Sequence, residues 1–261
     1  MGRLKVGVMV ESFRVGVREG VRMAREVRAD GIQVYTTRGE MAPENLSKSG
    51  RREFLSYVQS QGLVISALCG DYGKGGFVNP EGLEQRVENT NRVFDLARDL
   101  GVSFVTTHIG EVPEDQKSKA WGNLVEVIRD VAEYGARLGC CFATETGPES
   151  GGRLRDLLKA VNSDGARVNY DPANMVMRGF DPVQGAKDLK GFIVHTHAKD
   201  GVRNDDETHK EVPLGQGQVP WDEYIAALDE SGYDGFYTVE REVGENPAED
   251  IRKAVEFLRR F

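Results

Sequence analysis

The chain has 261 residues, a formal net charge of −8 and a pI near 5.2. The acidic balance argues against a protein that wraps nucleic acid or lies on anionic lipid, and no apolar stretch approaches membrane-spanning length. The three cysteines, Cys69, Cys140 and Cys141, form no C-x-x-C pair, so we expect reduced thiols in a cytoplasmic protein.

Short runs rich in β-branched and aromatic residues recur along the chain. The first occupies residues 4–10, and the later ones follow Gly31, Gly62, Gly101, Gly139, Gly165, Gly191 and Gly235. Glycine suits these places because it adopts the left-handed backbone that ends a helix before a strand begins. The runs therefore predict eight strands.

Apolar residues recur at helical spacing between these runs, as at Val17, Val21 and Ala24. Three helix starts are expected where a capping residue precedes proline, at 79–80, 181–182 and 246–247. Eight strands alternating with helices, at about thirty residues per unit, predict an α/β protein with a (β/α)8 TIM barrel. We expect one domain over residues 1–261. The competing architecture, a doubly wound open sheet, rarely has so many regular units.

Glu145, Asp171, His197 and Glu240 each stand at the end of one of the last four runs. Active sites of such barrels lie at the C-terminal ends of the strands, so these side chains are expected to meet. Three carboxylates held that close repel one another strongly without a cation. The set therefore predicts one divalent metal ion, Mn²⁺ first, with Mg²⁺, Co²⁺, Fe²⁺ or Zn²⁺ as alternatives.

Each of these residues also has an ordinary explanation when taken alone. Glu145 could be a solvated loop acid, and Asp171 could simply open a turn before a proline. His197 could be a hydrogen-bonded core histidine, and Glu240 could pair with a neighbouring arginine. The occurrence of four such residues on consecutive strands favours the metal site.

Further polar residues stand close to the predicted site. His108 is a candidate contact for a substrate oxygen or a buried structural histidine. Lys199 is a candidate to polarise a substrate oxygen, or to form a salt bridge with Asp200. His195 lies deeper on the same strand face and is expected in the core or as a support for the metal ligands. Residues 204–211 are expected to form an exposed acidic loop.

The residues also indicate a type of chemistry. A divalent ion chelated by adjacent oxygens of a hydroxyketone polarises the carbonyl and stabilises the enediolate that forms when a neighbouring proton leaves. Carboxylates on both faces of that intermediate permit inversion at carbon, and proton transfer between neighbouring carbons gives aldose–ketose isomerisation. Protonation of a leaving hydroxyl gives dehydration. The residues leave these outcomes open.

Several motifs resemble those of the xylose isomerase-like sugar phosphate isomerase/epimerase superfamily, over nearly the whole chain. This group includes ketose 3-epimerases, hydroxypyruvate isomerase and inosose dehydratase. The motifs are Glu145-Thr-Gly-Pro, Tyr170-Asp171-Pro-Ala-Asn, His195-Thr-His197-Ala-Lys-Asp200, Pro213-Leu-Gly-Gln-Gly217 and Val239-Glu240.

The resemblance implies that Glu145, Asp171, His197 and Glu240 bind one divalent metal ion. It further implies that the two glutamates exchange protons with the substrate from opposite faces, that Arg203 contacts the substrate, and that the chain forms a dimer or tetramer. Two positions depart from the pattern: Asn174 stands where the epimerases usually have histidine, and Gln216 where the superfamily commonly has glutamate.

The predicted function is a metal-dependent isomerase or epimerase of a small sugar or polyhydroxy ketone. The alternative is a metal-dependent dehydratase or lyase, resembling inosose or dehydroshikimate dehydratase or cleaving a keto-glycoside. Apurinic endonucleases share the barrel but use many histidines and a basic groove. This chain has 4 histidines and a net charge of −8, so we expect neither a nucleic-acid nor a membrane partner.

Overall fold

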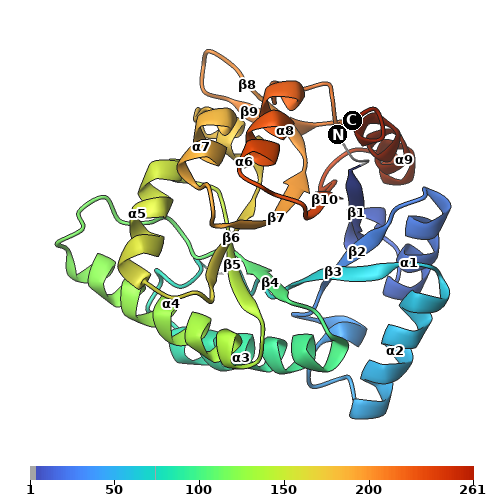
Figure 1. Cartoon of the computed structure of the whole chain (residues 1–261), viewed down its shortest axis with the longest axis horizontal. Helices are drawn as coiled ribbons and strands as arrows, with labels where there is room; N and C mark the ends of the chain where they lie inside the picture. Colours follow the sequence, from blue (N-terminus) through green and yellow to red (C-terminus); the bar gives the residue numbers. More distant parts are fainter. Residues whose placement is uncertain (1–3, 74) are drawn as a thin grey trace.

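A computed structural model describes residues 4–73 and 75–261, and within them parallel strands close into a barrel in the order β1-β10-β7-β6-β5-β4-β3-β2. The barrel strands are β1 (Lys5–Met9), β2 (Gly31–Tyr35), β3 (Val64–Cys69), β4 (Phe104–Thr107), β5 (Cys141–Glu145), β6 (Ala166–Tyr170), β7 (Ile193–Ala198) and β10 (Phe236–Val239). Each lies in a predicted run, so the TIM barrel is confirmed. Figure 1 shows these strands around the centre of the molecule, with helices outside them.

The helices follow the barrel strands along the chain and bury their apolar sides against the barrel. They are α1 (Val17–Glu26), α2 (Lys48–Ser60), α3 (Leu83–Leu100), α4 (Lys119–Arg137), α5 (Gly151–Val161), α6 (Pro172–Met177), α7 (Pro182–Asp188), α8 (Trp221–Glu230) and α9 (Pro247–Leu258), with short 3-10 helices η1 (Val10–Phe13) and η2 (Gly39–Met41). In α1, for example, Val21 and Ala24 are fully buried as their spacing predicts. Among the described residues, no helix combines the length and apolar content needed to cross a bilayer.

The three expected helix starts have different outcomes. Asp181 caps α7 as predicted, and α9 begins at Pro247, although Asn246 makes no side-chain cap bond. The expected start at residues 79–80 is wrong. Asn79 accepts a hydrogen bond from the backbone N–H of Glu81 in a turn, and left-handed Gly82 then separates that turn from α3.

A β-hairpin stands between β7 and α8, where an acidic loop was expected. Strand β8 (Asp200–Arg203) pairs antiparallel with β9 (His209–Val212), so the loop prediction is wrong for residues 209–211. His209 is exposed as expected, but the buried carboxylate of Glu211 accepts a hydrogen bond from Arg241, just beyond β10. This ion pair ties the hairpin to the strand that carries Glu240.

The strand register determines how the four predicted ligands meet. Glu145 pairs with Asn169 rather than with Asp171, and His197 pairs with Thr238 rather than with Glu240. The ligands are thus offset by two residues at two of their three strand junctions, because barrel strands are staggered. Side chains two residues apart share a face of a strand. All four therefore point into the barrel.

Candidate metal centre

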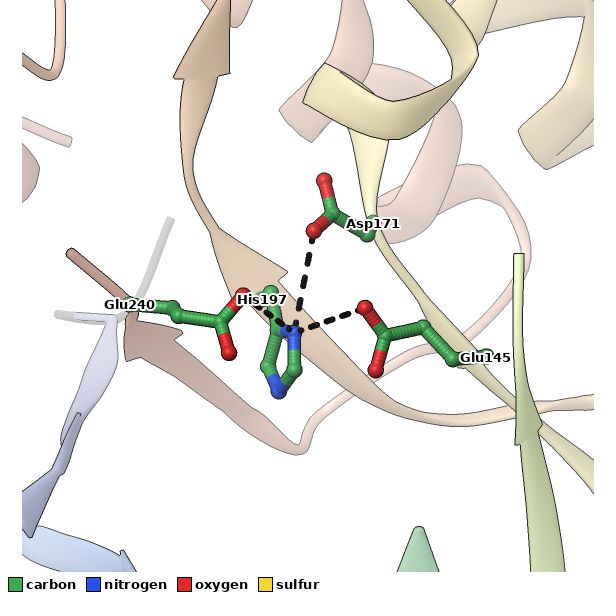
Figure 2. Close-up of side chains that lie close together, drawn as sticks. All are labelled: Glu145, Asp171, His197 and Glu240. Atoms are coloured by element: carbon green, nitrogen blue, oxygen red, sulfur yellow. Dashed lines mark ion pairs between the residues drawn. The ribbon is translucent and has the colours of Figure 1, made fainter. Parts of the chain in front are cut away.

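Glu145, Asp171, His197 and Glu240 converge at the C-terminal end of the barrel (Figure 2). His197 Nδ1 lies 3.4 Å from Glu145 Oε1, 3.7 Å from Asp171 Oδ2 and 3.3 Å from Glu240 Oε2. One ligand atom from each residue lies within 4.8 Å of the other three, and all four side chains are buried. The geometry thus brings together the complete predicted ligand set.

The carboxylate of Asp171 combines the two roles considered from the sequence. Its Oδ1 accepts hydrogen bonds from the backbone N–H groups of Ala173 and Asn174, so it caps α6 directly after β6. Its Oδ2 is buried without a hydrogen-bond partner and lies toward His197 Nδ1. The helix cap therefore fixes the carboxylate while leaving one oxygen free to ligate.

The fit of a metal ion follows from the groups left without hydrogen bonds. Asp171 Oδ2 and His197 Nδ1 are both buried and without partners, which is costly unless another group satisfies them. Ligands held about 2.1 Å from one ion lie roughly 3–4 Å apart. The distances from Nδ1 to the three carboxylate oxygens, 3.3 to 3.7 Å, match that spacing.

Two amides and an imidazole hold Glu145. Asn169 Nδ2 donates to Glu145 Oε2 at 3.2 Å, and Asn174 Nδ2 donates to Oε1 at 3.1 Å. His108 Nε2 lies 3.5 Å from the same Oε1, while its Nδ1 lies 2.9 Å from Asp71. Asn174, the first departure from the pattern that the sequence resembles, thus contacts the predicted ligand Glu145 directly. His108 lies beside this cluster, and its contact with a substrate stays a prediction.

Lys199 is buried next to Glu240. Its Nζ donates to Glu240 Oε2 at 3.1 Å and to Glu242 Oε1 at 2.6 Å, and lies 3.7 Å from Asp171 Oδ2. The alternative salt bridge to Asp200 is not formed. Burial opposes ionisation of Glu240, but Lys199 and His197 beside it lower the pKa of Glu240. The ammonium group of Lys199 thus lies next to two of the four predicted metal ligands.

The negative charge of the carboxylates also favours the protonated forms of His197 and His108. Burial disfavours the charged form of His197, but Glu240 and Glu145 raise its pKa well above the usual value. Glu145 likewise raises the pKa of His108 to about 10, against the effect of burial. Protons thus supply positive charge that a divalent ion would supply when bound.

Asp200 organises the segment around Gln216, the second departure from the superfamily pattern. Its carboxylate accepts from the backbone N–H groups of Gly201, Gly215, Gly217 and Val219 and from the indole N–H of Trp221. A Cβ at Gly217 would lie 2.0 Å from Asp200 Oδ1, so only glycine permits this approach. Asp200 therefore holds the loop that follows the hairpin.

Arg203 lies outside this cluster. Its guanidinium donates to the carbonyl of Met177 and pairs with Glu207 in the hairpin turn. Its predicted contact with the substrate stays a prediction.

Sequence reasoning missed Gln33 and Asn169, whose side chains contact the imidazole of His197. Both are fully buried and reach His197 Nε2, Gln33 with Oε1 at 3.0 Å and Asn169 with Nδ2 at 3.2 Å. The available signal was strand parity. Asn169 precedes Asp171 by two residues and so shares its inward face.

Comparison with known proteins agrees with this architecture. The family described as xylose isomerase-like TIM barrel matches residues 21–261. The chain is 38% identical to L-ribulose-5-phosphate 3-epimerase UlaE of Salmonella paratyphi C over 253 residues, which cover 92% of the chain and 88% of that protein. It is 32% identical to inosose dehydratase of Lacticaseibacillus casei over 131 residues, covering 43% of the chain and 44% of the dehydratase.

A solved structure extends the likeness to the whole fold. The crystal structure of a xylose isomerase domain protein from Planctomyces limnophilus superposes with a TM-score of 0.87 at 26% identity, covering 98% of this chain and 96% of that one. The chain is thus similar in sequence to one protein named as an epimerase and to one named as a dehydratase. The chain belongs to the xylose isomerase-like TIM barrel family.

Proposed function

We propose that this protein is a divalent-metal-dependent isomerase or epimerase of a small sugar or polyhydroxy ketone. The observation that carries the proposal is the convergence of four buried ligands with the two glutamates on opposite sides of His197 (Figure 2). The likeness to UlaE, an epimerase, supports it further. Mn²⁺ is the ion we expect first, because three carboxylates and one imidazole suit it.

The two glutamates can carry out the two proton transfers of the reaction. A bound divalent ion would polarise the substrate carbonyl and stabilise negative charge on its oxygens. Glu145 and Glu240 approach the cluster from opposite sides, so one can remove a proton from carbon while the other returns one to the opposite face. Asn169 and Asn174 hold the Glu145 carboxylate by hydrogen bonds to its two oxygens. His108, Lys199 and Arg203 are the side chains proposed to contact the substrate.

Metal removal and product analysis test the proposal. EDTA-treated protein should lose turnover and regain it with Mn²⁺. The substrate panel should contain free and 5-phosphorylated ketopentoses, since UlaE is named for a 5-phosphate. In D₂O, NMR should show deuterium entering the substrate carbon while the carbon skeleton stays intact. Full activity in chelator, or binding of no divalent ion, would refute it.

A dehydratase or lyase is the second candidate, favoured by the buried ammonium group of Lys199, 3.1 Å from Glu240 Oε2. An ammonium group in that position can protonate a leaving hydroxyl. The same D₂O experiment separates the two candidates, because a dehydratase product lacks the mass of one water and a lyase product lacks a fragment. Loss of either kind would replace the first proposal.

We also infer a cytoplasmic homo-oligomer, a dimer or tetramer, that takes a small-molecule substrate. Sedimentation of the purified chain would measure the assembly. A monomer at micromolar concentration would contradict this part of the proposal and leave the metal site untouched.

A further inference from the structure

The two ring nitrogens of His197 have different surroundings. Nδ1 lies toward three carboxylates and makes no hydrogen bond, whereas Nε2 lies 3.0 Å from Gln33 Oε1 and 3.2 Å from Asn169 Nδ2. A neutral imidazole carries one proton, and only its unprotonated nitrogen can bind a metal. If Nδ1 is the ligand, Nε2 must carry the proton and needs an acceptor.

Asn169 does not provide that acceptor. Its Oδ1 lies 2.8 Å from His195 Nδ1, and its Nδ2 donates to Glu145 Oε2 at 3.2 Å. This orientation presents the NH₂ group to His197. Asn169 therefore favours the tautomer of His197 in which Nε2 accepts and Nδ1 is protonated.

Gln33 has the opposite orientation. Its Nε2 donates to Thr106 Oγ1 at 2.8 Å, so its Oε1 is the atom presented to His197 across the barrel interior. Gln33 and Thr106 are both fully buried, on β2 and β4. Thr106 Oγ1 in turn donates to the carbonyl of Leu68 at 3.5 Å. Reversal of the amide would therefore cost one of these two hydrogen bonds inside a region closed to water.

We propose that Gln33 is a positioning residue that sets the ligating nitrogen of His197. By accepting a hydrogen bond from Nε2–H, it holds the ring so that the Nδ1 lone pair faces the three carboxylates. This inference rests on the proposed metal site. It adds that Gln33 raises the affinity of that site for its ion. Loss of such an outer hydrogen-bond partner typically lowers metal affinity by about 10–100-fold.

Mn²⁺ titration calorimetry of EDTA-treated protein tests the inference. Gln33→Met keeps the side-chain length but removes the acceptor, and its Kd should rise by about 10–100-fold. Gln33→Glu restores an acceptor and should bind nearly as tightly as the unaltered chain. Thr144→Val is the matched control, since Thr144 Oγ1 is a buried barrel hydroxyl without a partner. It should leave the Kd unchanged.

A second readout follows the proton itself. In Zn²⁺-loaded protein, ¹⁵N–¹H correlation spectra should place the His197 proton on Nε2 in the unaltered chain and in Gln33→Glu. Gln33→Met should lose that single form. The kcat of Gln33→Met should equal that of the unaltered chain at saturating Mn²⁺, because the substitution weakens binding of the ion and not the chemical step.

The outcomes separate this inference from the proposed function. If the unaltered chain binds no divalent ion, both fail. If it binds Mn²⁺ and Gln33→Met binds equally well with the proton still on Nε2, only the role of Gln33 is refuted. If Gln33→Met does not fold, Gln33→Asn replaces it, because its shorter side chain moves the acceptor oxygen away from His197. The Kd for Mn²⁺ should rise in this variant too. Undiminished affinity in that variant would overturn the inference.

Discussion

Replacement of Asp200 by asparagine should destabilise the protein strongly. Asp200 accepts five N–H donors, two at Oδ1 and three at Oδ2. An amide NH₂ group in place of either oxygen breaks at least two of these bonds and sets donor against donor. A hydrogen bond to a charged group contributes about 1.5–3 kcal/mol, so Asp200→Asn should cost roughly 3–6 kcal/mol.

Thermal and urea unfolding measure this loss. For a chain of this size, about 1 kcal/mol corresponds to roughly 2–4 °C in Tm, so the variant should melt at least ~6 °C lower. Asp205→Asn, on the exposed hairpin turn, is the matched control and should change the free energy of unfolding by less than ~0.5 kcal/mol. If Asp200→Asn costs no more than this control, the hydrogen-bond reasoning for the loop is wrong.

Three further changes probe the site and its surroundings. Glu240→Gln should lower kcat/KM by at least ~10²-fold while the thermal transition stays cooperative, and undiminished turnover would contradict the proton-transfer role. Asn174→Ala removes one hydrogen bond from Glu145 and should lower kcat by ~10-fold or more, so an unchanged kcat would show that the contact is dispensable. Burial raises the pKa of Glu149 to about 7, so the folded protein loses stability as pH rises from about 4.5 towards 7. The stability of Glu149→Gln relative to the unaltered chain should therefore rise by up to ~3 kcal/mol between about pH 4 and about pH 8, and a constant difference would refute the shift.

The barrel and its predicted ligands were accessible to sequence reasoning because both follow from local rules. Glycines before β-branched runs marked the strands, and the C-terminal ends of parallel strands share one face of the barrel. Glu145 and Glu240 could thus be placed together although they are far apart in the chain. Their precise offset could not be placed, because it depends on the stagger between neighbouring strands.

The contacts that sequence reasoning missed are long-range and polar. Gln33 meets His197 across 164 positions of the chain, and nothing in either strand alone identifies the pair. Strand β9 is similarly hidden, since His209 and Lys210 are exposed and Glu211 is charged. Glu211 becomes buried because Arg241, from beyond β10, neutralises it. Such pairs can be recognised only when the tertiary fold brings them together.

The stagger in steps of two gives the barrel a ready set of positions for redesign. A second ring of inward-facing side chains lies two residues before each ligand, about 7 Å deeper along the strands. Its members are Ala143, Asn169, His195 and Thr238. Substituting metal ligands at these four positions would therefore move the ion site deeper into the barrel. Insertion of one residue in any of these strands would instead turn its ligand outward, against the helices.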